Sequence, residues 1–338
     1  MKSKELVRKA IEFGNPDRLP FWQHEAPEAT QALHLPDVPD DVWDIWEMDR
    51  AQAGWFFDHP GPDDWGCIWE VTEVKNMGQV KVHPLADAPA LKTYRPPDPR
   101  NPYYFERVGP PLEEAGERYV VVTCHFNLVE RLHMLRGFSQ TMEDLYLAPQ
   151  LVERILDMIL EFKLEQLDEL SRRFGKAIHG IFLTDDWGTQ QGTFISLDLF
   201  DRFFAPRYRQ LFGAIHDHGW HVILHSCGRI NDFVPRLIEV GADVLNMQQP
   251  RAYGLVEFGE QFKGKVCFLT TCDIQTTLPS GSEAAVREEA RLLVEHWSVP
   301  EGGFIVFNYG DPDALAIPPH MTEIMFDEFV KLMHYWKR

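Results

Sequence analysis

The stretch HVILHSCGR, residues 221–229, carries the pattern on which both the predicted fold and the predicted chemistry depend. Its apolar first half is typical of a strand that is buried on both faces. In an extended chain, residues i and i+2 point to the same side, so His225 and Cys227 would project together where the strand ends. An imidazole and a thiol so placed can hold a zinc ion, and Gly228 permits a sharp turn. The pair alone is a weak motif, because most such residues belong to a core or a loop.

The same strand pattern recurs from about residue 118 onward and alternates with amphipathic segments of helical periodicity. This alternation predicts a parallel sheet covered by helices, as in a (β/α)8 TIM barrel. Seven strands are clear, so we expect either a degenerate eighth strand or a distorted sheet. The expected strands span residues 18–22, 119–124, 178–184, 221–227, 243–247, 266–271 and 304–308.

Residues 28–117 interrupt this alternation and are rich in Trp, Asp and Pro. Within them, residues 67–73 and 79–83 flank a turn at 76–78 and predict a β-hairpin. A chain of 338 residues fits one barrel with inserted loops. We therefore expect one domain over residues 1–338, a distorted TIM barrel whose N-terminal insertion forms a hairpin and helical lid over one mouth.

The composition excludes several classes of partner. The formal net charge of -19 argues against binding to nucleic acid or to an anionic membrane surface. No run approaches the ~20 apolar residues of a membrane span, and residues 1–18 predict a charged amphipathic helix without a signal core. Five scattered cysteines fit free thiols and metal ligands better than a disulfide framework. A cytoplasmic protein is expected, and a homo-oligomer is compatible with the sequence.

Polar residues follow nearly every expected strand. In a TIM barrel these strand ends meet at one mouth, where they would form a polar, partly acidic pocket. Some of them also fit a structural role: Asp185 or Asp186 could cap a turn, and His24 could bond only to a backbone carbonyl. The candidates for the site are Trp22, His24, Asp185, Asp186, Trp187, Gln190, His225, Cys227, Cys272, Asn308 and Tyr309.

Four motifs in this order resemble the uroporphyrinogen decarboxylase superfamily, and its cobalamin-linked methyltransferase-like branch most closely. They are NPDRLP (15–20), DDWG (185–188), HSCG (225–228) and DIQTTLP (273–279). The resemblance covers nearly the whole chain and implies a distorted TIM barrel with its site at the C-terminal mouth. The tetrapyrrole decarboxylases of the family carry two arginines after the first strand, whereas residues 21–28 here contain none. Substrate carboxylates would meet Glu25 and Glu28 instead, which disfavours authentic uroporphyrinogen decarboxylase activity.

The methyltransferase branch implies a zinc ion held by a His-x-Cys pair and a more distant cysteine. The pair corresponds to His225 and Cys227, but the last strand, where the third ligand is expected, contains no cysteine. The third ligand therefore stays open among Cys272, Asp186 and Glu25.

The expected function is zinc-dependent transfer of a methyl group between a small substrate and a corrinoid. The substrate would be a thiol, an amine or a methyl ether, and a separate protein would carry the corrinoid (cobalamin). Asp185, Asp186 and His24 are the candidate catalytic residues, while a second set would shape the substrate pocket: Trp22, Trp187, Gln190, Asn308 and Tyr309. Two alternatives remain: a metal-free decarboxylase of a small acid or tetrapyrrole, and a non-catalytic barrel that binds a ligand or corrinoid.

Overall fold

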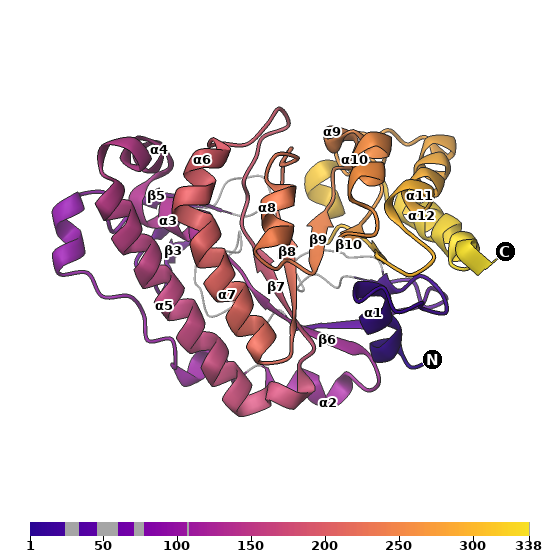
Figure 1. Ribbon diagram of the computed structural model, residues 1–338, viewed down its shortest axis with the longest axis horizontal. Helices are drawn as coiled ribbons and strands as arrows, with labels where there is room; N and C mark the ends of the chain where they lie inside the picture. Colours follow the sequence, from indigo (N-terminus) through magenta and orange to yellow (C-terminus); the bar gives the residue numbers. More distant parts are fainter. Residues whose placement is uncertain (24–33, 46–59, 71–77, 107, 338) are drawn as a thin grey trace.

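Eight parallel strands form a nearly closed barrel surrounded by helices, as the sequence predicts (Figure 1). The computed structural model describes residues 1–23, 34–45, 60–70, 78–106 and 108–337. The strands follow the order β1-β11-β10-β9-β8-β7-β6-β2. Their bounds are β1 (Phe21–Trp22), β2 (Val42–Ile45), β6 (Tyr119–Cys124), β7 (Gly180–Thr184), β8 (His221–His225), β9 (Val244–Met247), β10 (Cys267–Thr270) and β11 (Phe304–Phe307).

The eighth strand, β2, lies within the segment that the sequence assigned to the insertion. It pairs in parallel with β6, so the barrel takes up part of residues 28–117. Strands β1 and β2 are not paired as a ladder, and two hydrogen bonds link their starts: the Asp41 N–H donates to the Phe21 carbonyl at 2.8 Å, and the Phe21 N–H donates to Asp41 Oδ2 at 3.0 Å. The sheet is therefore distorted between β1 and β2, and the expectation of a weak eighth strand is confirmed.

Side chains alternate between the barrel interior and the outer layer, because successive residues of a strand point to opposite sides. Helix α1 (Ser3–Ile11) closes the N-terminal end of the barrel, since its residues Val7, Ala10 and Ile11 join the interior cluster. The strand residues of that cluster are Trp22, Val42, Tyr119, Val121, Phe182, Ile223, Val244, Cys267, Leu269, Ile305 and Phe307.

Helices cover the outside of the barrel (Figure 1). Besides α1 they are α2 (Gly109–Glu114), α3 (Leu128–Arg136), α4 (Phe138–Leu147), α5 (Pro149–Phe174), α6 (Leu197–Leu199), α7 (Ala205–Asp217), α8 (Val234–Glu239), α9 (Pro250–Tyr253), α10 (Leu255–Phe262), α11 (Glu283–Trp297) and α12 (Pro319–Leu332). In the described part of the chain, none of them is both long and apolar enough to cross a bilayer.

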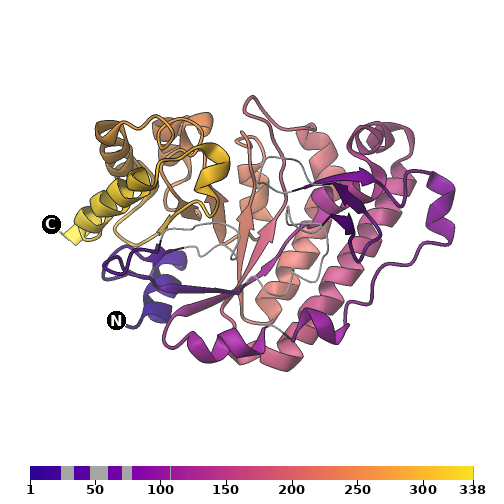
Figure 2. The same ribbon diagram turned by 180° about the vertical axis from the view of Figure 1, so that it is seen from behind.

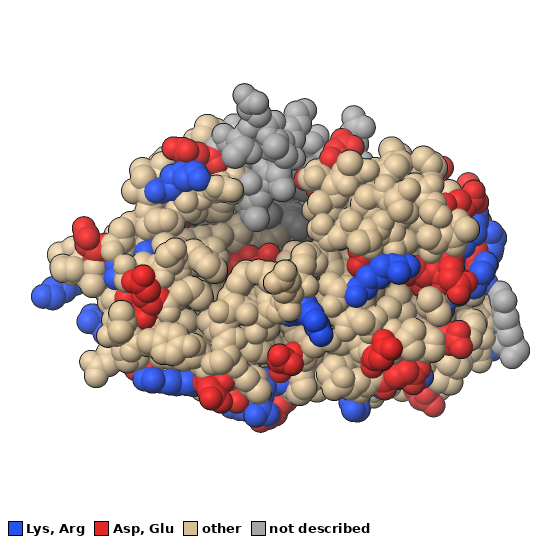
Figure 3. Space-filling view, turned by 90° about the horizontal axis from the view of Figure 1, so that it is seen from above, with Lys and Arg blue, Asp and Glu red and all other residues tan. Residues whose placement is uncertain are grey.

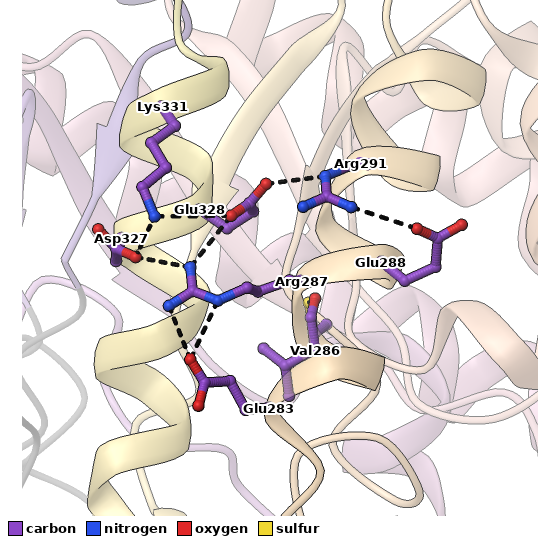
Figure 4. Close-up of polar contacts among 9 residues, drawn as sticks. Glu283, Val286, Arg287, Glu288, Arg291, Asp327, Glu328 and Lys331 are labelled. Carbon is purple, nitrogen blue, oxygen red and sulfur yellow. Dashed lines mark hydrogen bonds and ion pairs between the residues drawn. The ribbon is translucent and has the colours of Figure 1, made fainter.

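Charged side chains join α11 to α12 on the outer surface (Figure 4). Arg287 lies 2.6 Å from Asp327 and 3.0 Å from both Glu283 and Glu328. Arg291 also contacts Glu328, at 2.9 Å. Ion pairs near the surface contribute little individually, but Glu328 is buried between the two helices, and together these pairs hold two neighbouring helices of the outer layer in register.

A small antiparallel sheet lies beside α3 and α4 (Figure 2). It contains β3 (Gly61–Pro62), β4 (Ile68–Glu70) and β5 (Gln79–Val82), so the expected hairpin is present, although its turn lies outside the described residues. Asp63 and Arg131 of α3 form a buried ion pair at 3.1 Å that fixes this sheet. Because α3 begins where β6 ends, the sheet lies near the C-terminal mouth of the barrel.

Candidate metal centre

Asp186, His225 and Cys227 come together at the C-terminal ends of β7 and β8. Thr184 and His225 are neighbours in the register of these strands, and stepping two residues onward reaches Asp186 and Cys227. One ligand atom from each of the three residues lies within 4.8 Å of the other two. His225 Nε2 is 3.3 Å from Cys227 Sγ and 3.6 Å from Asp186 Oδ1. The predicted proximity of His225 and Cys227 is therefore observed, and Asp186 is the third group.

Two glycines let the loops after β7 and β8 touch. Gly228 has a φ of +81°, and a Cβ there would lie 2.7 Å from Gly188 Cα and closer still to the Gly188 carbonyl group. The Cys227 N–H donates to Asp186 Oδ1 at 2.7 Å. This close backbone approach, which requires glycine, holds the carboxylate of one loop beside the thiol of the other.

The His225 ring is oriented by Asn246 on β9. Asn246 uses Nδ2 to donate to the Leu269 carbonyl, and its Oδ1 also accepts from Gln248, so Oδ1 accepts from His225 Nδ1 at 2.7 Å. This network assigns the proton to Nδ1 and leaves the Nε2 lone pair facing Cys227. The ring also stacks over Phe182 in the barrel interior.

Glu130 of α3 is a further acidic group at this site, which the sequence reasoning missed. Its buried carboxylate accepts a hydrogen bond from Thr184 Oγ1 at 2.8 Å. Burial raises the pKa of Glu130, and the charges of Asp186 and Asp185 raise it further. Glu130 lies on the first turn of α3, beyond the end of β6, so the polar residues at the strand ends do not include it.

The acidic groups destabilise one another's ionised forms. Burial raises the pKa of the Cys227 thiol, and the nearby charges of Asp186 and Glu130 add to this effect. Arg131, which follows Glu130, is engaged by Asp63 in the buried ion pair. Figure 3, which views the mouth, shows acidic side chains in the central hollow. A bound cation would relieve this accumulation of negative charge, and the three donor types are those that zinc binds.

Comparison with known proteins places the chain in a family. The family model described as uroporphyrinogen decarboxylase (URO-D) matches residues 62–336. The chain belongs to the uroporphyrinogen decarboxylase family. No curated protein sequence matches it.

Solved structures resemble this URO-D family member to different extents. A methyltransferase from Methanosarcina mazei superposes with a TM-score of 0.72 at 16% identity, covering 98% of this chain and 99% of that one. A D-psicose 3-epimerase has a TM-score of only 0.40 at 10% identity, covering 68% of this chain and 93% of that one. The first superposition shows that this URO-D family member shares its whole fold with a methyltransferase.

Asp185 does not face the group formed by Asp186, His225 and Cys227, although it was a candidate catalytic residue. Its carboxylate accepts the backbone N–H groups of Leu128, Val129 and Glu130 at 2.8, 3.1 and 2.8 Å and also the Tyr208 hydroxyl. Burial is the main cause that raises its pKa, to about 6. Asp185 thus has a structural role, but it caps α3, which precedes it in the chain, and not the turn that follows it; this cap fixes Glu130 at the mouth.

Cys272 and Trp187 point away from the site, contrary to expectation. The Cys272 thiol is buried and faces the Val286 carbonyl of α11 at 3.5 Å, so the structure does not bring it to His225. Trp187 is also buried, and its indole packs edge-on against Phe204 at 4.6 Å within the helical layer. Strand β10 ends at Thr270, and beyond it both Thr271 and Cys272 turn toward the outer helices, where Thr271 Oγ1 donates to Met325 Sδ of α12. Trp187 directly follows Asp186 and points to the opposite side of the chain.

The remaining candidates take different positions. Tyr309 is half-buried and faces the group: burial raises the pKa of its hydroxyl, and the charges of Asp311, Cys227 and Asp186 raise it further. Gln190 is exposed and donates to Gln249 Oε1 at 3.0 Å, while Asn308 is buried. Trp22 is buried in the interior, edge-on to Phe182. His24 and Glu25 lie outside the described residues.

Proposed function

We propose that this URO-D family protein is a zinc-dependent methyltransferase that moves a methyl group between a small substrate and a corrinoid. The observation that carries the proposal is the group of Asp186, His225 and Cys227 at the C-terminal mouth. Three protein ligands are typical of catalytic zinc sites, which keep a fourth position for a small molecule. The Asp186 side chain is 36% exposed and that of His225 14%, so the group can be reached from the mouth.

The protein residues would each contribute to holding the metal. His225 presents Nε2 because Asn246 accepts its other proton. Cys227 would lose its proton only when a cation is present, since burial and the neighbouring carboxylates raise the pKa of its thiol. When bound, zinc would lower the pKa of a thiol acceptor or polarise the heteroatom of a methyl donor. Tyr309, half-buried beside the group, would contact the substrate.

A separate protein would carry the corrinoid. The family match runs over residues 62–336, and the described elements before it, α1, β1 and β2, belong to the same barrel. The metal group lies at one end of the barrel, where a docked partner could present a methylated cofactor to it. A metal-free decarboxylase is less well supported, because Asp185, one of its two proposed acids, is occupied in capping α3.

The proposal is tested by following methylation of a free reduced corrinoid by its absorbance. Zinc-loaded protein would be mixed with a methylated thiol, a methylated amine or an aryl methyl ether. We expect turnover with at least one donor, its loss on chelation, and its loss in the His225→Ala, Cys227→Ser double variant. The Cys272→Ser variant is the matched control, because its thiol faces α11, and it should retain activity. Wild-type rates in the chelated protein would contradict the proposal.

A further inference from the structure

Tyr253 has a buried hydroxyl whose proton meets no acceptor in the described part of the chain. The side chain is 3% exposed, and the hydroxyl donates to none of the described residues. Its ring is held by Phe258 at 5.4 Å and Trp297 at 6.3 Å between centroids. A buried hydroxyl proton without an acceptor is costly, so it indicates a ligand that the folded chain does not itself supply.

The backbone places Tyr253 on a segment that neighbours the group of Asp186, His225 and Cys227. Helix α9 follows β9, the strand that pairs with β8, and β8 carries His225 at its end. Asn231, four residues after Cys227, donates from Nδ2 to the Tyr253 carbonyl at 2.7 Å. The Asn231 Oδ1 atom is also buried and has no partner in the described structure. Two unsatisfied polar atoms thus lie on adjacent segments beside the site.

Electrostatics supports the same placement of the hydroxyl. Burial raises the pKa of Tyr253, and the charge on Cys227 raises it further. A backbone hydrogen bond from Gln249 to the hydroxyl oxygen lowers it, while the charges of Asp273 and Asp186 raise it. The charges of Cys227 and Asp186 therefore act on the hydroxyl, which keeps its proton at neutral pH.

We propose that the Tyr253 hydroxyl donates a hydrogen bond to the sulfur or oxygen of a small thiol or phenol held at the open side of the Asp186, His225 and Cys227 group. The inference rests on the proposed function and narrows its substrates. An amine nitrogen has a single lone pair, which a metal would take, whereas thiolate sulfur and phenolate oxygen keep further lone pairs for the hydroxyl. A thiol would be the methyl acceptor, and a phenol the product left by an aryl methyl ether.

The test compares wild-type protein with Tyr253→Phe. Both would be loaded with Co²⁺ in place of zinc and titrated separately with 2-mercaptoethanol and with phenol, while the absorbance of the metal is followed. Loss of a hydrogen bond to a charged atom should weaken binding about 10- to 100-fold. Metal content should be unchanged, and the Tm of the metal-free variant should equal or exceed that of wild type, because the lost hydroxyl donates its proton to no described protein group. The probe that shows the loss identifies the ligand as a thiol or a phenol.

Tyr208→Phe is the matched control, since Tyr208 is another buried tyrosine but donates to Asp185 and accepts from Trp187. It should lower the Tm. Equal affinity of Tyr253→Phe and wild type for both probes would overturn the inference, as would a lower Tm of the metal-free Tyr253→Phe protein or failure of both probes to bind wild type. A wild-type protein that binds no metal would overturn the proposed function as well, whereas the other outcomes leave it standing.

Discussion

Replacing Gly228 by alanine should damage both the stability and the metal site. The new Cβ would overlap the backbone of Gly188. The alanine would also have to adopt the left-handed backbone conformation, at a φ of +81°. A left-handed alanine costs about 1–2 kcal/mol, and overpacking costs about 1–3 kcal/mol. The sum is about 2–5 kcal/mol, which for a chain of 338 residues corresponds to a Tm lower by about 3–7 °C.

The same substitution should weaken zinc binding. Gly228 follows Cys227, and Gly188 lies two residues after Asp186, so separating the loops would move two proposed ligands apart. Disturbing the support of metal ligands typically weakens affinity about 10- to 100-fold. Thermal unfolding and a competition titration with a zinc chelator would measure the two effects. Gly192→Ala is the control, because a Cβ there meets no atom within 4 Å. A Gly228→Ala protein with wild-type Tm and zinc affinity would refute the reasoning.

Three further predictions concern groups around the site. The pKa of Asp185 in the native state, about 6, exceeds the ordinary value of 3.8 expected in the unfolded chain, so the native state binds this proton more tightly. As the pH rises from 4 to 6, the unfolding free energy of wild type should therefore fall by up to about 3 kcal/mol more than that of Asp185→Asn. Denaturant titrations over this pH range measure both, and the same pH dependence in the two proteins would contradict the prediction. Asn246→Ala should weaken zinc binding about 10-fold, as measured by chelator competition, because His225 loses its orienting partner. Arg131→Ala should lower unfolding free energy by about 3–5 kcal/mol by leaving Asp63 buried without its cation, and unchanged denaturant midpoints would exclude this.

Local periodicity predicted the parts of the molecule that depend on neighbouring residues. Alternation of strands with helices gave the barrel, and the period of two along β8 gave the proximity of His225 and Cys227. The period of two does not reach Cys272, because β10 ends at Thr270 and both Thr271 and Cys272 contact the outer helices.

Other features depend on contacts between distant segments. The cap that Asp185 provides to α3 joins residues 55–57 positions apart, so no local pattern shows it. Strand β2 has four residues and a mixed burial pattern in a segment rich in Trp and Asp, and only its pairing with β6 defines it. Glu130 was missed for a related reason, because its place at the mouth follows from the Asp185 cap.

The most direct test of the proposed metal centre is zinc affinity in two single variants, measured by chelator competition with metal analysis of the purified proteins. Asp186→Ala should weaken zinc binding at least about 10-fold, because it removes one of three adjacent ligands. Cys272→Ser should bind zinc as wild type does, since its thiol faces the Val286 carbonyl. Zinc binding that survives loss of Asp186 and disappears with Cys272 would contradict the assignment.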